Sequence, residues 1–279
     1  MMSTGKEFHI FTVGVSILQN SSSYLKDRGY EDAASWSRLS PTDEMQRKLE
    51  GWAYKGAEPF KLVCDLVKSD PKGKSAELNA FLAYLDSNPV TKDSVEIGLY
   101  TTDTGNGWFC GMVLYEVLKE MGFTVNEPVR VKHFGLGPSF LQDALAELMD
   151  KIARVVVSKK EQGLRVCLNA TGGYKPEVTF AVITSLALGV DRVYYIHEGF
   201  RDLVVLPSPP LTLRKEVVEK LRMLFENPEG LPKHLLIENL GWKVEEIDDL
   251  IFDGLVEERD GIVKLRRWVR KLMELAIKA

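Results

Sequence analysis

One stretch near the middle of the chain limits the possible folds more than any other. It runs from Leu164–Leu168, a strand-like apolar segment, through a polar loop at Asn169–Pro176 to an apolar helix over Val178–Leu188. The paired glycines of the loop let the backbone approach a ligand closely. Unpaired N–H groups at the start of the helix, together with Lys175, attract anions. The pattern predicts a pocket for a phosphate or another anion, and the plainer alternative is a tight turn with an incidental surface lysine.

Strands and amphipathic helices alternate along most of the chain. The strands are predicted at Phe8–Val13, Val95–Tyr100, Val129–His133, Leu164–Leu168 and Arg192–Ile196. Such alternation is typical of an α/β fold with a Rossmann-like, mostly parallel sheet. Polar loops are predicted at Gly14–Asn20, Thr101–Gly107 and Asn169–Lys175, each at the carboxyl end of a strand. Because ligands bind at this edge of open α/β sheets, we expect the three loops to converge on one site.

The segment after the first strand interrupts this alternation. Residues from about 21 to 89 are polar and helical in pattern, which predicts a helical insertion packed on one flank of the sheet. Just before it, Ser16 follows Gly14-Val15 at the end of the strand. Ser16 is either a helix N-cap or a hydrolase nucleophile, although the closing glycine of a G-x-S-x-G turn is missing. The pattern of the insertion itself indicates no catalytic role.

Composition sets limits on the function. The net charge of −4 and the isoelectric point near 5.7 argue against a general nucleic-acid binder, so an anionic ligand needs a local site. Cys64, Cys110 and Cys167 are odd in number and scattered, as expected for reduced thiols in a cytoplasmic protein. No signal peptide or membrane-spanning run is predicted. Four histidines without a metal-binding spacing favour a site with no metal and no cofactor.

A proline cluster at Leu206–Pro210 marks a predicted boundary between a larger domain at 1–206 and a smaller one at 211–279. Three helices are predicted at Leu211–Phe225, Pro232–Asn239 and Lys243–Phe252, followed by a hairpin with an Asp260-Gly261 turn. This is the order of a winged helix-turn-helix. The third helix is strongly acidic, which opposes binding to duplex DNA and favours a role in dimerisation or capping. One basic cluster is the exception: Lys264, Arg266, Arg267, Arg270 and Lys271.

Four short motifs together resemble a known family. They are Gly14-Val15-Ser16 after the first strand, Asp103-Thr104 after a middle strand, the N-x-T-G-G-x-K segment at Asn169–Lys175, and the strand end Tyr194–Glu198. This set is similar to CARF domains, the CRISPR-associated Rossmann fold. It is most similar to the ring nucleases, which join a CARF domain to a carboxyl-terminal winged helix. The resemblance covers nearly the whole chain, and the N-x-T-G-G-x-K segment is its most specific part.

The resemblance implies a homodimer whose two CARF domains share a two-fold pocket for cyclic tetra-adenylate. Ring nucleases cut this second messenger of type III CRISPR systems to linear di-adenylate with a 2′,3′-cyclic phosphate, which switches off the downstream antiviral effectors. Attack of a ribose 2′-OH on its neighbouring phosphate needs in-line positioning and stabilisation of negative charge, and no metal. The predicted catalytic residues are Lys175, which stabilises that charge, and Ser16, which holds the 2′-OH or a phosphate oxygen.

Other residues of these loops are predicted to bind the ligand. They are Gly14, Val15, Thr102, Asp103, Thr104, Asn106, Trp108, Phe134, Asn169, Thr171, Gly172 and Gly173. The polar side chains suit ribose and adenine edges, and Trp108 or Phe134 offers a ring on which a base stacks. Two further functions stay open. One is a sensor that binds the ring without cutting it, and the other is a ligand-sensing transcriptional regulator built from the same two domains.

Overall fold

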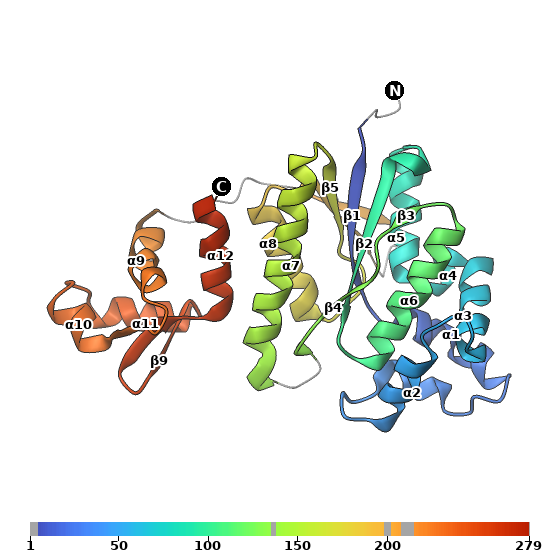
Figure 1. Cartoon of the computed structure of the whole chain (residues 1–279), viewed down its shortest axis with the longest axis horizontal. Coiled ribbons are helices and arrows are strands. Elements are labelled where there is room, and N and C mark those ends of the chain that lie inside the picture. Colours follow the sequence, from blue (N-terminus) through green and yellow to red (C-terminus); the bar gives the residue numbers. More distant parts are fainter. Residues whose placement is uncertain (1–4, 135–137, 198–201, 208–214, 279) are drawn as a thin grey trace.

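Seven strands form a central sheet in the part of the chain that the structure describes, in the order β3-β2-β1-β5-β6-β7 with β4 also paired to β2 (Figure 1). The structure is a computed structural model, and it describes residues 5–134, 138–197, 202–207 and 215–278. The strands are β1 (Glu7–Val13), β2 (Val95–Thr102), β3 (Thr124–Val125), β4 (Val129–Val131), β5 (Arg165–Asn169), β6 (Arg192–Ile196) and β7 (Leu203–Leu206). Every pair is parallel except β6 with β7. The prediction of an α/β fold with a mostly parallel sheet is therefore confirmed.

Strand β1 lies at the centre of this sheet and is buried along its whole length. It pairs with β2 from Glu7 to Val13 and with β5 from Glu7 to Phe11. A strand covered on both faces needs apolar residues in a continuous run, which the segment Phe8–Val13 supplies. Strands β3 and β7 were not predicted, since strands of two and four residues give little readable alternation.

Helices cover both faces of the sheet. They are α1 (Ser16–Lys26), α2 (Glu44–Trp52), α3 (Glu58–Ser69), α4 (Pro71–Lys74), α5 (Ala76–Ser87), α6 (Gly105–Glu120), α7 (Leu141–Glu161) and α8 (Lys175–Ala187). One apolar cluster joins α1, α2, α3, α5 and α6 to one face, and a second joins α7 and α8 to the other (Figure 1). The predicted insertion is thus helical and packs on one face of the sheet, together with α6.

The polar segments at the carboxyl edge are shorter than predicted. Helix α1 begins at Ser16, so residues 16–20 are helical and Ser16 is its first residue rather than its N-cap. Strand β2 continues to Thr102. Helix α6 then begins almost at once, because the Gly107 N–H donates to the Thr104 hydroxyl oxygen and this caps the helix. Only short turns therefore separate the strands from the helices that follow them.

The carboxyl-terminal residues form a separate apolar cluster. Its elements are α9 (Lys215–Glu226), β8 (Leu231–Pro232), α10 (Lys233–Glu238), α11 (Val244–Phe252), β9 (Val256–Arg259), β10 (Ile262–Leu265) and α12 (Arg267–Lys278). The three strands form an antiparallel sheet in the order β8-β10-β9. The hairpin turns at Asp260-Gly261, where both residues have positive φ, as the Asp-Gly pair predicts. Residues 208–210 of the predicted boundary segment, and the first four residues of the helix predicted at 211–225, lie outside the described residues.

Helix α12 joins this carboxyl-terminal unit to the rest of the protein by packing against α7 (Figure 1). Arg267 forms an ion pair with Asp143 of α7. The ring of Trp268 meets Phe180 of α8 edge-on, with the ring centroids 5.5 Å apart. Within the described ranges, no helix combines the length and the apolar character needed to span a bilayer.

Candidate functional site

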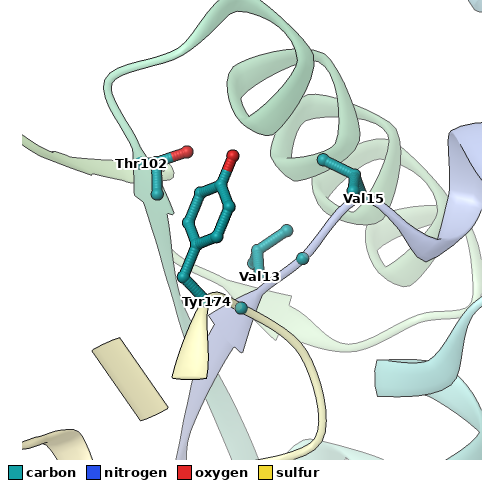
Figure 2. Close-up of a pocket in the computed structure, with 6 residues that line it drawn as sticks. Val13, Val15, Thr102 and Tyr174 are labelled. Atoms are coloured by element: carbon teal, nitrogen blue, oxygen red, sulfur yellow. The ribbon is translucent and has the colours of Figure 1, made fainter. Parts of the chain in front are cut away.

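A small pocket lies at the carboxyl ends of β1 and β2, where the loop after β5 also arrives. Figure 2 shows the residues that line it: Val13, Gly14, Val15, Thr102, Gly173 and Tyr174. The three segments that we expected to converge therefore meet here. Gly14, Val15, Thr102 and Gly173 are among the predicted ligand-binding residues, whereas Tyr174 was quoted in the motif without a role.

Glycines allow the first and third segments to touch. A Cβ atom on Gly14 would lie 2.7 Å from the backbone nitrogen of Gly173, and one on Gly172 would lie 2.8 Å from the nitrogen of Gly14. Gly173 also has a φ of +111°, a backbone conformation that side chains disfavour. The close approach of the two backbones is the structural reason for glycine at positions 14 and 172, and the positive φ is the reason at position 173.

A buried carboxylate from the insertion holds the turn at Gly14–Ser16. Glu77, in the first turn of α5, is fully buried. Its Oε1 accepts from the Gly14 N–H at 2.8 Å, and its Oε2 accepts from the hydroxyls of Ser16 at 3.2 Å and Ser75 at 2.8 Å. Ser16 Oγ in turn accepts from the N–H of Ala76 at 3.1 Å. The insertion is thus part of the site, which the sequence did not predict.

Helix α8 begins at the pocket. Its N-cap residue is Tyr174, which is 47% exposed and whose ring points into the space between Thr102 and the two valines (Figure 2). Lys175 is the first helical residue; its side chain is exposed and makes no hydrogen bond or ion pair with any described residue. The positive end of the α8 dipole and this ammonium group therefore lie together beside the pocket, and both favour an anion.

A second buried carboxyl group lies against the glycine loop. Glu177 is fully buried; its Oε2 accepts from the Tyr174 N–H at 3.2 Å, and its Oε1 has no partner among the described residues. Burial raises the pKa of Glu177 to about 8, and the negative charge of Glu77 adds to this effect, although the Tyr174 N–H opposes it. The carboxyl is therefore largely protonated at neutral pH.

Comparison with known proteins agrees with the motifs at this edge. Residues 72–209 match the model of a family described as CRISPR-associated protein (Cas_APE2256). Over this segment the chain is thus similar to CRISPR-associated proteins. The match is consistent with a CARF-domain family and indicates a CRISPR-related role. The matched segment includes Glu77, Thr102 and the loop from Asn169 to Lys175.

One similar solved structure is the crystal structure of protein VC1899 from Vibrio cholerae. It is 12% identical in sequence, with a TM-score of 0.36, and the alignment covers 98% of this chain and 67% of that chain. A similarity this distant carries no argument about either fold or function.

Two predicted ligand-binding residues of the CRISPR-associated segment instead stabilise its glycine loop. Asn169 is fully buried, and its Nδ2 donates to the backbone oxygen of Glu77 at 2.9 Å. Its Oδ1 accepts from the Thr171 hydroxyl at 2.6 Å. Neither side chain lines the pocket. Asn169 therefore connects the loop to helix α5, and Thr171 completes that connection.

Residues at the start of α6 are also engaged within the protein. Asn106 is buried, and its Nδ2 donates to the backbone oxygen of Trp36 in the insertion at 3.2 Å. The hydroxyl of Thr104, besides capping α6, lies 2.8 Å from that of Thr102. The ring of Trp108 is covered by the guanidinium group of Arg130, 4.0 Å from the ring centroid. The sequence around Trp108 contains no basic residue, but the fold brings Arg130 to it from strand β4.

Asp103 and Phe134 lie on the far side of β2 from β1. Asp103 Oδ2 accepts from the His133 N–H at 2.8 Å, and His133 has an unusual positive φ of 75°. Asp103 therefore fixes the turn after β4. Phe134 packs against the apolar cluster of α7 and α8. Neither residue lines the pocket, so the exposed aromatic side chain there is that of Tyr174.

Glu177 and Glu77 were not predicted from the sequence, and they differ in whether a local sequence pattern indicates their role. Glu177 stands three residues after the N-cap of α8 and accepts from the Tyr174 N–H, which is one half of a capping box. Because the N-cap residue is a tyrosine rather than a serine or threonine, the sequence shows only the spacing. Glu77 gives no such signal, since it binds Gly14 and Ser16 more than sixty residues earlier in the chain.

Proposed function

We propose that the protein is a ring nuclease that binds cyclic tetra-adenylate and cuts it, without a metal, to linear di-adenylate with a 2′,3′-cyclic phosphate. In a type III CRISPR system this reaction would switch off signalling. The relation to CRISPR-associated proteins supports the proposal. The observation that carries it is the meeting of the Gly14–Ser16 turn with the loop before Lys175 at one edge of the sheet.

The proposed chemistry uses groups that lie beside the pocket. A ribose 2′-oxygen attacks the neighbouring phosphorus, and the bond from phosphorus to the 5′-oxygen breaks. Negative charge develops on the phosphate oxygens, where Lys175 and the N–H groups at the start of α8 would stabilise it. The half-exposed ring of Tyr174 offers a surface on which an adenine stacks.

The size of the pocket supports a homodimer. In one chain the pocket has a cavity volume of about 60 Å³. Ligand pockets commonly enclose roughly 300–1,000 Å³ for drug-sized molecules, and a ring of four nucleotides is larger than these. Two chains related by a two-fold axis would offer two such pockets to one ring. Symmetric attack at both would release two di-adenylates.

The carboxyl-terminal unit has the element order of a winged helix-turn-helix, and we assign it to dimerisation or capping. Four side chains of its basic cluster are occupied within the protein. Lys264 pairs with Glu257 and Arg267 with Asp143, while Arg266 and Arg270 donate to backbone oxygens. Helix α11 adds negative charge, so we do not expect duplex DNA as a partner.

The test is incubation of the purified protein with cyclic tetra-adenylate in EDTA, with products separated by chromatography and identified by mass spectrometry. We expect linear di-adenylate ending in a cyclic phosphate. Lys175→Ala should slow cleavage by about 100- to 1,000-fold, the usual effect of removing one charge-stabilising group. The matched control is Lys6→Ala, which removes an exposed lysine at the opposite edge of the sheet, next to the amino end of β1, and should cleave at the wild-type rate.

Other outcomes would contradict the proposal in distinguishable ways. Intact ligand that stays bound would exclude the enzyme and favour a sensor, a result compatible with the engaged hydroxyl of Ser16. Salt-dependent binding to duplex DNA would favour a transcriptional regulator. If Lys6→Ala lost as much cleavage as Lys175→Ala, the assignment of the cleavage site to the pocket beside Lys175 would be wrong.

A further inference from the structure

We propose that Glu77, on helix α5 of the insertion, is a positioning residue that acts on the ligand through Ser16. This inference rests on the proposed function, because it specifies how Ser16 meets the attacking 2′-OH. It gives the insertion a chemical task. Glu77 does not line the pocket, so it is not assigned contact with the ligand.

The hydrogen bonds of Ser16 determine where its hydroxyl hydrogen points and which lone pair is left for the ligand. A serine hydroxyl has one hydrogen to donate and two lone pairs that accept. Since a carboxylate oxygen only accepts, the hydrogen of Ser16 Oγ is directed at Glu77 Oε2, 3.2 Å away. One lone pair accepts from the Ala76 N–H at 3.1 Å. Ser16 is not itself in the pocket lining, but it directly follows Val15, which is. Its remaining lone pair is therefore left to accept a hydrogen bond from a ribose 2′-OH at the edge of the pocket.

The surroundings of Glu77 select a carboxylate at this position. Three donors reach its two oxygens: the Gly14 N–H and the hydroxyls of Ser16 and Ser75. An amide in its place would present an N–H group to at least one of these donors. The space is also filled, since a Cβ atom on Gly172 would lie 1.9 Å from Glu77 Oε1. Glu77 thus fixes both the Gly14–Ser16 turn and the orientation of the Ser16 hydroxyl.

The proposed step balances as follows. The 2′-oxygen forms a bond to phosphorus while its proton passes to Ser16 Oγ, and the proton of Ser16 passes to Glu77 Oε2. The bond between phosphorus and the 5′-oxygen breaks, its electron pair stays on that oxygen, and water supplies the proton that makes a 5′-hydroxyl. Glu77 then releases its proton to solvent and Ser16 is restored. No oxidant, reductant or metal is needed.

A double-mutant cycle tests whether Glu77 acts through Ser16. Glu77→Gln keeps the shape of the side chain, and an amide oxygen can still accept from Gly14, but its N–H faces a hydroxyl donor. We expect about a hundredfold fall in kcat with KM changed less than threefold, since positioned proton transfer contributes about 10²–10⁴-fold. In a Ser16→Ala background the same substitution should change kcat less than threefold, because the group through which Glu77 acts is gone.

The control is Glu58→Gln, which makes the same substitution at an exposed position on α3 of the same insertion and should leave kcat unchanged. Equal effects of Glu77→Gln in both backgrounds, or no effect on kcat, would overturn the inference while leaving the proposed function standing. Thermal unfolding of each variant separates loss of folding from loss of rate.

A measurement without ligand separates the two proposals. The amide hydrogen of Gly14 is bonded to Glu77, so Glu77→Ala should speed hydrogen exchange at residues 14–16 relative to strand β1. Unchanged exchange would overturn the role of Glu77 in holding the turn. Absence of cleavage and binding by the wild type would instead overturn the proposed function, whatever the exchange result.

Discussion

The two ends of strand β1 both carry buried acidic groups, but they are built differently. At the amino end, His9 lies 2.9 Å from the Tyr194 hydroxyl through Nδ1 and 3.1 Å from Glu7 through Nε2. Glu7 also pairs with Arg165 at 2.6 Å. Cys167 is close enough for the three residue types to suggest a metal site, yet both ring nitrogens of His9 already have protein partners. This end is a closed network inside the core.

The two ends also differ in the ionisation of their carboxyl groups. At the amino end, burial opposes ionisation of Glu7, but its hydrogen bond with His9 and the charges of Arg165 and Arg192 hold the pKa of Glu7 below its ordinary value. The carboxyl end, with Glu177, is more open. Glu177 lies deeper than Glu7, with only the Tyr174 N–H to support its charge, and burial raises its pKa to about 8. Burial and the number of charged or donor partners together decide whether such a carboxyl is ionised. We expect substitutions at the amino end to change stability and those at the carboxyl end to change ligand binding.

The largest expected effect is on stability. His9→Ala removes the residue that bridges Glu7 and Tyr194, and leaves a buried carboxylate with fewer partners. Loss of a buried ring together with its two hydrogen bonds costs about 3 kcal/mol of unfolding free energy, measurable by urea denaturation. Affinity for cyclic tetra-adenylate should stay within twofold. His234→Ala, at an exposed position, is the control and should change stability by less than about 0.5 kcal/mol. A large loss of affinity in His9→Ala would show that the buried network at the amino end of β1 influences ligand binding at the carboxyl end.

The next effect belongs to the open end. Gly172→Ala would place a Cβ atom 1.9 Å from Glu77 Oε1 and 2.8 Å from the Gly14 nitrogen, so the loop and the turn must separate. We expect affinity for cyclic tetra-adenylate, measured by calorimetry, to fall at least a hundredfold, or about 2.7 kcal/mol. Gly51→Ala is the control: its Cβ atom meets nothing within 4 Å, and the helix α2 should gain stability. Unchanged affinity in Gly172→Ala would place the ligand elsewhere.

Local patterns in the sequence predicted five strands of the sheet, but not β3 and β7. The run Phe8–Val13 is apolar throughout because β1 is covered on both faces, and the alternation of strands with helices predicted parallel pairing. The Asp260-Gly261 hairpin followed from the turn preference of that dipeptide. Segment ends were less predictable. Thr104 ends the loop after β2 by capping α6, and nothing in its neighbours distinguishes a capping threonine from a ligand-binding one.

The site could be predicted only in part, for a similar reason. Backbone features have local signals, so the glycines and Lys175 were found. The direction of a polar side chain depends on distant partners: Asn169 turns to α5 and Asn106 to the segment around Trp36. Glu77 could not be predicted for the same reason: it belongs to the insertion, and its partners Gly14 and Ser16 are distant in the sequence.

A pH-dependent effect of intermediate size is expected at Glu177. The folded protein holds this proton more tightly than the unfolded chain, with a pKa of about 8 against an ordinary 4.5. Its contribution therefore lowers stability as the pH rises between these values and is constant above them. Glu177→Gln removes this dependence. Relative to the variant, the wild type should lose about 1.4 kcal/mol of unfolding free energy between pH 6 and pH 7. If the difference in urea midpoint between the wild type and Glu177→Gln were the same at pH 6 and at pH 7, Glu177 would be ionised in the folded protein.

The smallest effect compares two tyrosines. Tyr194→Phe removes the hydroxyl near His9 but keeps the ring stacked on Tyr84, with centroids 4.6 Å apart. It should cost about 1 kcal/mol of stability, the worth of one hydrogen bond, and leave ligand affinity unchanged. Its counterpart Tyr174→Ala should leave stability nearly unchanged, since the ring is half exposed. It should weaken binding by about 1–3 kcal/mol through loss of base stacking. If Tyr194→Phe weakened binding as much as Tyr174→Ala, a buried hydroxyl at one end of β1 would be controlling the pocket at the other. The two ends would then be one coupled network.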